Sequence, residues 1–116
     1  MKHYDKDGKI NFVDENNVFL GYDMEQSCCE QADWFIADRI HSDILPRNKR
    51  VPDLTAFRFD TEFFYSSEIE GTSIAVFRIT DGETQMFIHL HNTHNGYYSH
   101  GFNFTISGYT RQEGIL

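Results

Sequence analysis

The sequence predicts an α+β fold, in which an antiparallel sheet of about five to six strands carries one principal helix on one face. Three observations support this prediction. Short β-rich segments recur along the chain, one segment has helical periodicity, and aromatic residues make up 16% of the 116 residues. Large rings fill a core quickly, so one helix on a small sheet would be enough. A chain of this length is expected to form a single domain, residues 1–116.

The first β-rich stretch runs from Lys9 to Tyr22. Two short apolar runs, Ile10–Val13 and Val18–Leu20, flank the turn-like residues Asp14–Asn17. Runs of this kind, bounded by Asp and Asn, are typical of strands joined by a turn. The stretch therefore predicts one or two strands.

The principal helix is predicted at residues 27–40. Ser27 and Glu30 match a capping box, in which each side chain satisfies a free backbone N–H at the helix start. At 100° per residue the apolar side chains fall on one arc; they are Cys28, Cys29, Ala32, Phe35, Ile36 and Ile40. Trp34 falls on the polar side. It is therefore a candidate partner-binding residue, although packing under a loop is an alternative.

The second half of the chain has a β pattern. It predicts strands at Ala56–Phe64, Thr72–Thr80, Glu83–His91 and Gly101–Ser107, with a connection at Ser66–Gly71. The Asp81–Gly82 pair between the second and third of these strands suits a type I′ turn. These two strands therefore form the clearest predicted hairpin of the chain.

Four of the six histidines lie between His89 and His100. Because side chains alternate along a strand, His89 and His91 point to one face, about 7 Å apart. The opposite face, with Met86, Ile88 and Leu90, is expected to pack on the core. A turn at residues 95–96 would return the chain so that His100 lies beside His91.

This histidine segment predicts a zinc site, because imidazole and thiolate ligands favour zinc over magnesium or calcium. The candidate ligands are His89, His91, His94, His100, Cys28, Cys29 and Asp23. Asp23 could bind as an oxygen ligand or orient an imidazole. Four protein ligands leave no open position, so the zinc would be structural. In the alternative, His89 and His91 simply line an exposed sheet face.

The chain has ten basic and eighteen acidic residues, a net charge of −8. Phosphates need a basic footprint, so direct nucleic-acid binding is not expected. An acidic surface favours a protein partner with a basic surface. No apolar run approaches the ~18–20 residues of a membrane span, and the N-terminus does not resemble a signal peptide. Two adjacent cysteines do not make a disulfide framework, so a cytoplasmic location is expected.

Two blocks of sequence carry a resemblance to a known family. Gly21-Tyr22-Asp23 with Cys28-Cys29-Glu30, and later His94 to Phe102, resemble an uncharacterised family of small phage and bacterial domains. The resemblance covers about a quarter of the chain and implies that the cysteine and histidine blocks belong to one site. Small acidic phage proteins are similar in character to inhibitors of host defence, anti-CRISPR proteins among them. The implied location is then the host cytoplasm.

Three functions follow from these expectations. The first is a zinc-binding inhibitor from a mobile element, which docks on a basic protein such as a Cas effector. The second is a small metal-dependent hydrolase, with three protein ligands and an activated water. No general base or pocket is evident for it, so no catalytic residue is assigned and the chain is not expected to be an enzyme. The third is an interaction module without metal.

Overall fold

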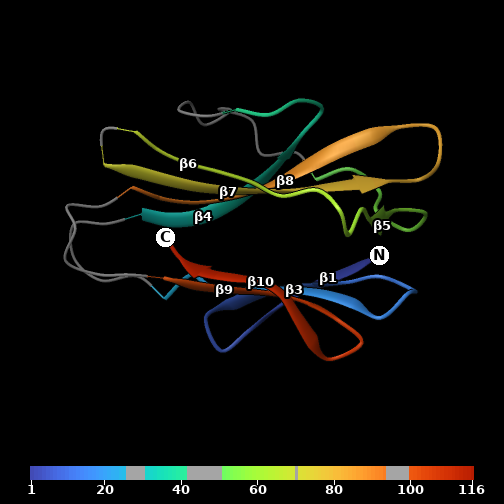
Figure 1. The fold of residues 1–116 in the computed structure, drawn as a ribbon, viewed down its shortest axis with the longest axis horizontal. Helices are drawn as coiled ribbons and strands as arrows, with labels where there is room; N and C mark the ends of the chain where they lie inside the picture. The colour runs from blue at the N-terminus through green and yellow to red at the C-terminus, as the bar shows by residue number, and fades with distance from the viewer. Residues whose placement is uncertain (26–30, 42–50, 70, 94–99) are drawn as a thin grey trace.

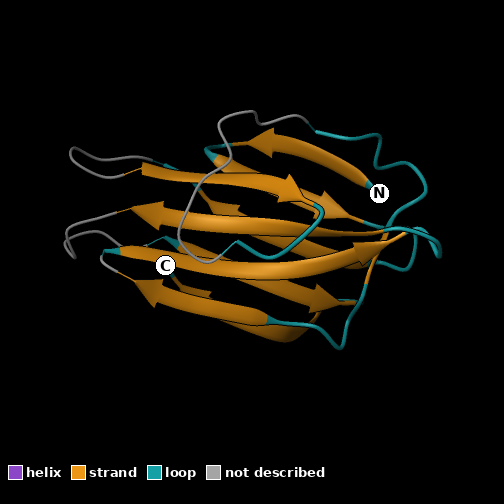
Figure 2. Ribbon diagram, turned by 90° about the horizontal axis from the view of Figure 1, so that it is seen from above, coloured by secondary structure: helices purple, strands orange, loops and turns teal. Residues whose placement is uncertain are grey.

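A computed structural model of the chain describes residues 1–25, 31–41, 51–69, 71–93 and 100–116. In these ranges the protein is all-β, and two antiparallel sheets face each other as a sandwich (Figure 1). No helix occurs in the described ranges (Figure 2). The predicted α+β fold with a principal helix is therefore wrong. A second sheet takes the place that the prediction gave to the helix.

The first sheet has the strand order β1-β2-β3-β9-β10. Its strands are β1 (Lys2–Lys6), β2 (Lys9–Val13), β3 (Val18–Asp23), β9 (Gly101–Ile106) and β10 (Tyr109–Ile115). The second sheet has the order β4-β8-β7-β5, and β6 also pairs with β7. Its strands are β4 (Gln31–Ala37), β5 (Arg58–Phe59), β6 (Tyr65–Ile69), β7 (Thr72–Thr80) and β8 (Gln85–Thr93).

The predicted helix fails because β4 occupies most of its described part. Ala32, Trp34 and Ile36 of β4 pair with inward-facing positions of β8, whereas Phe35 pairs with His89 on the other face. Both faces of this strand carry apolar side chains, so the apolar positions do not alternate in sequence. In a strand that is apolar on both faces, the spacing of the apolar residues can match the period of a helix. Periodicity by itself then does not distinguish the two. The predicted capping box at Ser27 lies outside the described residues.

The predictions for the other strands had mixed outcomes. One or two strands were predicted between Lys9 and Tyr22, and the structure has two, β2 and β3; the predicted hairpin is confirmed as β7 and β8. Gly82 has a positive φ of 98°, but Asp81 does not have the positive φ that a type I′ turn also requires, and residues 81–84 form a four-residue loop. The predicted turn type is therefore wrong. The strand predicted at Ala56–Phe64 is reduced to β5, and the predicted connection at Ser66–Gly71 is mostly the strand β6. The edge strands β1 and β10 were not predicted.

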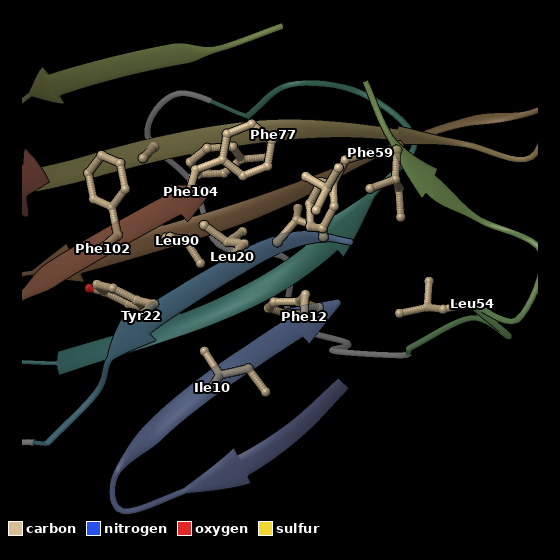
Figure 3. Close-up of a cluster of buried hydrophobic side chains, with 14 of the residues drawn as sticks. Ile10, Phe12, Leu20, Tyr22, Leu54, Phe59, Phe77, Leu90, Phe102 and Phe104 are labelled. Atoms are coloured by element: carbon tan, nitrogen blue, oxygen red, sulfur yellow. The ribbon is translucent and has the colours of Figure 1, made fainter. Parts of the chain in front are cut away.

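The core lies between the two sheets and is built largely of aromatic rings (Figure 3). Phe77 of the second sheet contacts Phe104 of the first, with ring centroids 4.9 Å apart, and Phe59 contacts the same ring at 5.1 Å. Both inner faces interdigitate in this way, as expected for a sandwich. The high aromatic content of the sequence is thus explained by a core that joins two sheets.

Buried polar contacts tie the ends of the sandwich together. The Asp14 carboxylate accepts hydrogen bonds from the backbone N–H groups of Asn16 and Val18 in the β2–β3 turn, and from Phe59 in the second sheet at 2.9 Å. Leu116 exchanges two backbone hydrogen bonds with His100, and its carbonyl accepts a third from Asn92 of β8. Both connections hold the sheets in register, which fixes the positions of their outer faces.

Candidate functional site

His89 and His91 share one face of β8, as predicted, and Ile88 and Leu90 point to the core on the other face. The histidine face is the outer face of the second sheet. It is not exposed, because His89, His91, Ile74, Val76 and Phe35 are all buried there. The alternative in which the two histidines line an exposed face is therefore wrong. These five residues form a second, smaller core, which we call the histidine cluster.

Contacts on both sides fix the ring of His89. Its Nδ1 lies 3.1 Å from the carbonyl oxygen of Phe87, and its Nε2 accepts the backbone N–H of His41 at 3.0 Å. Phe35 stacks on the ring, with centroids 4.2 Å apart and an interplanar angle of 11°. The chain that leaves β4 thus folds over the outer face of the second sheet and is held there by a neutral imidazole (Figure 1).

The pKa of His89 is lowered to about 4, chiefly by burial and to a smaller extent by the neighbouring His41 and His91. The hydrogen bond to the Phe87 carbonyl opposes this shift. The geometry agrees with the direction, because an Nε2 that accepts the His41 N–H cannot carry a proton at the same time. His89 is therefore a neutral structural acceptor at physiological pH.

Asp23 and His100 lie in a different part of the molecule. The Nδ1 atom of His100 is 2.9 Å from the backbone carbonyl oxygen of Asp23, and its ring contacts Tyr22 with centroids 6.4 Å apart. Both residues belong to the first sheet or its border, whereas the His91 side chain is on the outer face of the second sheet. The four candidate ligands within the described residues, Asp23, His89, His91 and His100, therefore do not converge on one point.

The described residues contain no group of three or more His, Cys, Asp or Glu side chains that could hold a metal ion. Within the described residues the metal-binding prediction is therefore wrong, because β8 buries His89 and His91 against Phe35 and uses them for packing. Cys28, Cys29 and His94 lie outside the described residues. The resemblance to phage domains, and the inhibitory role drawn from it, stay predictions that nothing in the structure tests.

Trp34 points toward the first sheet. Its ring meets Phe12 edge-on, with centroids 5.1 Å apart and an angle of 85°, and contacts His3 at 5.8 Å. It was expected on the polar side of a helix, and this placement is wrong because β4 turns alternate residues inward. A role for Trp34 in binding a partner stays a prediction.

A groove of about 370 Å³ opens on the outer face of the first sheet. Its lining residues are Lys9, Asn11, Phe19, Gly21, Tyr22, Asp23, Gly101, Phe102 and Asn103. Asn11, Gly21 and Asn103 are direct partners on the adjacent strands β2, β3 and β9. Two side-chain amides therefore flank a glycine in one row across the sheet.

Gly21 forms the floor of this groove, and the side chains of Phe19 and Asn11 lie close to its Cα. A Cβ at position 21 would lie 3.0 Å from Cε1 of Phe19 and 3.3 Å from Oδ1 of Asn11. The Phe19 ring and the Asn11 amide thus border the space that a side chain would fill. The Asn11 Nδ2 donates to the Lys9 carbonyl at 3.4 Å, which orients the amide.

The groove has little net charge, because Lys9 and Asp23 are direct partners on β2 and β3. The prediction from sequence missed it. The signal was present: Asn is depleted in strands, yet Asn11 and Asn103 both stand in mid-strand on the outer face, where Asn103 is exposed and Asn11 is 8% exposed. Their proximity depends on the pairing of β3 with β9, which are eighty residues apart in the chain and meet only in the folded protein.

Searches against family models, curated proteins and solved structures found no match to this chain. The class of the protein is therefore defined by its own fold, a two-sheet antiparallel sandwich with a groove on one outer face. In the ranges that the structure describes, no helix is long and apolar enough to cross a membrane. The cytoplasmic location stays a prediction.

Proposed function

We propose that this protein is a non-catalytic binding module, which holds a neutral polar ligand in the groove of the first sheet. The observation that carries the proposal is the row Asn11–Gly21–Asn103 with Phe19 beside it. A concave surface that combines an aromatic ring with a few placed polar groups is the usual form of a binding site. Each amide offers both donors and an acceptor, so the row can bind a ligand without any charge.

The proposal is tested by titrating the full chain, labelled with ¹⁵N, with a panel of probes. The panel holds neutral linear tetrasaccharides, the charged tetrasaccharide of galacturonic acid, a neutral Gly-Ser peptide and a tetralysine peptide. Support would be amide shifts that saturate and cluster at Asn11, Gly21 and Asn103 with at least one of the neutral probes. The proposal is overturned if no neutral probe shifts the resonances of the groove residues.

A second candidate function is docking on a protein with a basic surface, and the net charge of −8 favours it. The groove does not select such a partner, because Lys9 and Asp23 balance each other there. Tetralysine should therefore shift resonances outside the groove, and its effect should fade as salt is raised. Shifts that persist in high salt, or none at all, contradict this second candidate.

A further inference from the structure

We infer that the ligand of the groove is a neutral oligosaccharide that lies across the strands of the first sheet. This inference rests on the proposed function and specifies its ligand class. The row of the groove continues on both sides: Tyr4 of β1 pairs with Asn11, and Glu113 of β10 pairs with Asn103. Because strands lie about 4.8 Å apart, the row of five positions spans about 19 Å. That length suits a chain of several sugar rings.

The chemistry of the row matches a sugar chain. Tyr4 is 46% exposed and presents a ring at one end, while Phe19 presents a ring beside the glycine floor. Aromatic rings pack against the apolar faces of sugar rings, and planar amides and carboxylates hydrogen-bond their hydroxyl groups. Asn11, Asn103 and Glu113 supply those polar groups between and beyond the rings.

A peptide ligand fits less well, because the backbone of the groove is already paired. Peptides that join a sheet do so by adding a strand at a free edge. The groove lies over β3, which pairs with β2 on one side and with β9 on the other. An extended peptide would find no ladder of free N–H and C=O groups there. Only side chains and the glycine floor face the ligand.

Charge also narrows the ligand class. Lys9 and Asp23 stand side by side below the amide row, and Glu113 ends the row on β10. Lys6 of β1 pairs with Lys9, so a polyanionic saccharide would meet two carboxylates and two ammonium groups and would gain no net attraction. Neutral glycans are therefore favoured over sulfated or uronic-acid chains.

The test measures the affinity of the full chain for cellotetraose and maltotetraose by calorimetry, with tetragalacturonate and the neutral Gly-Ser peptide as comparison probes. At least one neutral tetrasaccharide should bind, and Asn103→Ala should weaken that binding about tenfold, as expected for a lost hydrogen bond. Thr105→Ala is the matched control, because Thr105 is on the same strand and face but outside the groove lining. The Thr105→Ala variant should bind the tetrasaccharide with the affinity of the wild type.

A second variant, Tyr4→Ala, tests whether the ligand extends along the whole row. Tyr4 lies at its end, so Tyr4→Ala should weaken a tetrasaccharide more than the corresponding disaccharide. If the peptide shifts the groove resonances and no neutral saccharide does, the saccharide inference is overturned while the binding module stands. If no probe shifts the groove resonances, the saccharide inference and the proposed binding function are both overturned. Equal losses in Asn103→Ala and Thr105→Ala would also overturn the inference.

Discussion

The outer faces of the two sheets have opposite characters. On the first sheet, Asn11, Gly21 and Asn103 lie in an open groove. On the second sheet, the corresponding face is covered: His89 and Val76 are buried, and His89 accepts the backbone N–H of His41, which follows β4. One face of this sandwich is thus available to a ligand, whereas the other has become a second core. His89 and His91 are the more conspicuous residues in the sequence, yet they lie on the closed face.

The difference is visible in the burial of the strands. β3 alternates buried and half-buried residues, as expected for a strand with one face toward water. β7 is buried at five consecutive positions, Ser73 to Phe77, as expected for a strand covered on both faces. The continuous buried run thus shows that β7 is covered on both faces, and the alternation shows that β3 is covered on one.

The largest expected contrast is between two phenylalanines, one on each outer face. Phe35→Ala removes a 2% exposed ring that stacks on His89, so it should lower the free energy of unfolding by about 3–5 kcal/mol. Phe19→Ala removes a half-buried ring and should cost roughly 1 kcal/mol. Urea unfolding of both variants measures the contrast. Equal costs would mean that the second sheet's outer face is not a core.

The next effect is the dependence of stability on pH. His89 has a folded pKa of about 4 against 6.5 in the unfolded chain, so only the unfolded state gains its proton in between. The contribution of His89 to the free energy of unfolding is fully present above pH 6.5. It is lost by about 3 kcal/mol as the pH drops toward 4. Unfolding by urea at several pH values measures the slope.

His89→Gln should flatten this slope and lower stability at pH 7, because the buried acceptor is replaced. His3→Gln is the control, since His3 is exposed on β1. An unaltered slope in His89→Gln would show that His89 is not the group responsible.

Alanine substitutions at two strand glycines, Gly114 and Gly21, should differ less in their effect on the free energy of unfolding. A Cβ at Gly114 would lie 2.9 Å from Cε1 of Phe102, whose ring is buried in the core and has little room to move. Gly114→Ala should therefore cost about 1–3 kcal/mol by overpacking. Gly21→Ala meets the half-exposed ring of Phe19, which can swing toward solvent, so its cost should be smaller. Thermal unfolding that ranks them in the opposite order would contradict this account of the inner and outer faces of the first sheet.

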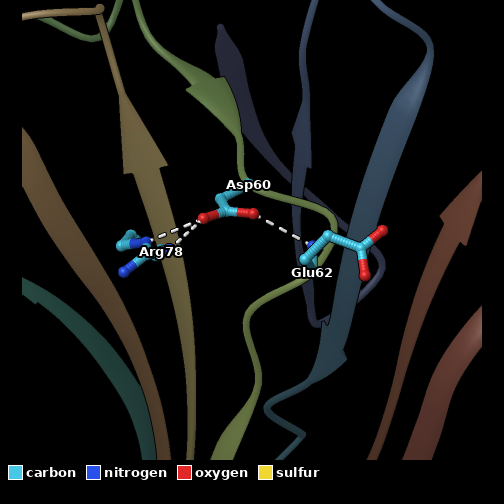
Figure 4. A network of polar contacts seen from close by, with 3 residues as sticks. All are labelled: Asp60, Glu62 and Arg78. Atoms are coloured by element: carbon cyan, nitrogen blue, oxygen red, sulfur yellow. Dashed lines mark hydrogen bonds and ion pairs between the residues drawn. The ribbon is translucent and has the colours of Figure 1, made fainter.

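The smallest effect concerns the ion pair on the second sheet. Arg78 donates two hydrogen bonds to one oxygen of Asp60, and the other oxygen accepts the Glu62 N–H (Figure 4). The hydrogen bonds from Arg78 lower the pKa of Asp60. Asp60→Asn should cost about 1 kcal/mol at pH 7.

That cost should vanish as the pH falls through the folded pKa of Asp60, because the wild-type carboxylate then loses its charge as well. Glu62→Gln is the control. Its side chain is 82% exposed beside Arg111, so no measurable change is expected. If Asp60→Asn still lowers the free energy of unfolding in acid, the wild-type side chain stabilises the protein through its shape and not through its charge.

The sequence was sufficient for local features and insufficient for pairing between distant strands. The β7–β8 hairpin and the alternation of His89 and Leu90 are local, and both were predicted correctly, although the turn is not the predicted type I′. β4 was mistaken for a helix because Trp34 and Phe35 are apolar on opposite faces of one strand. The groove was missed because Asn11 and Asn103 become neighbours only through β3.

The central claim is that ligand binding belongs to the open face and not to the closed one. The most direct measurement compares Asn103→Ala with Thr93→Ala, an exposed position on the outer face of the second sheet, in calorimetric titrations with the neutral tetrasaccharide that the wild type binds. The account predicts about tenfold weaker binding for Asn103→Ala and wild-type affinity for Thr93→Ala. Loss of binding in Thr93→Ala with Asn103→Ala unaffected would contradict it.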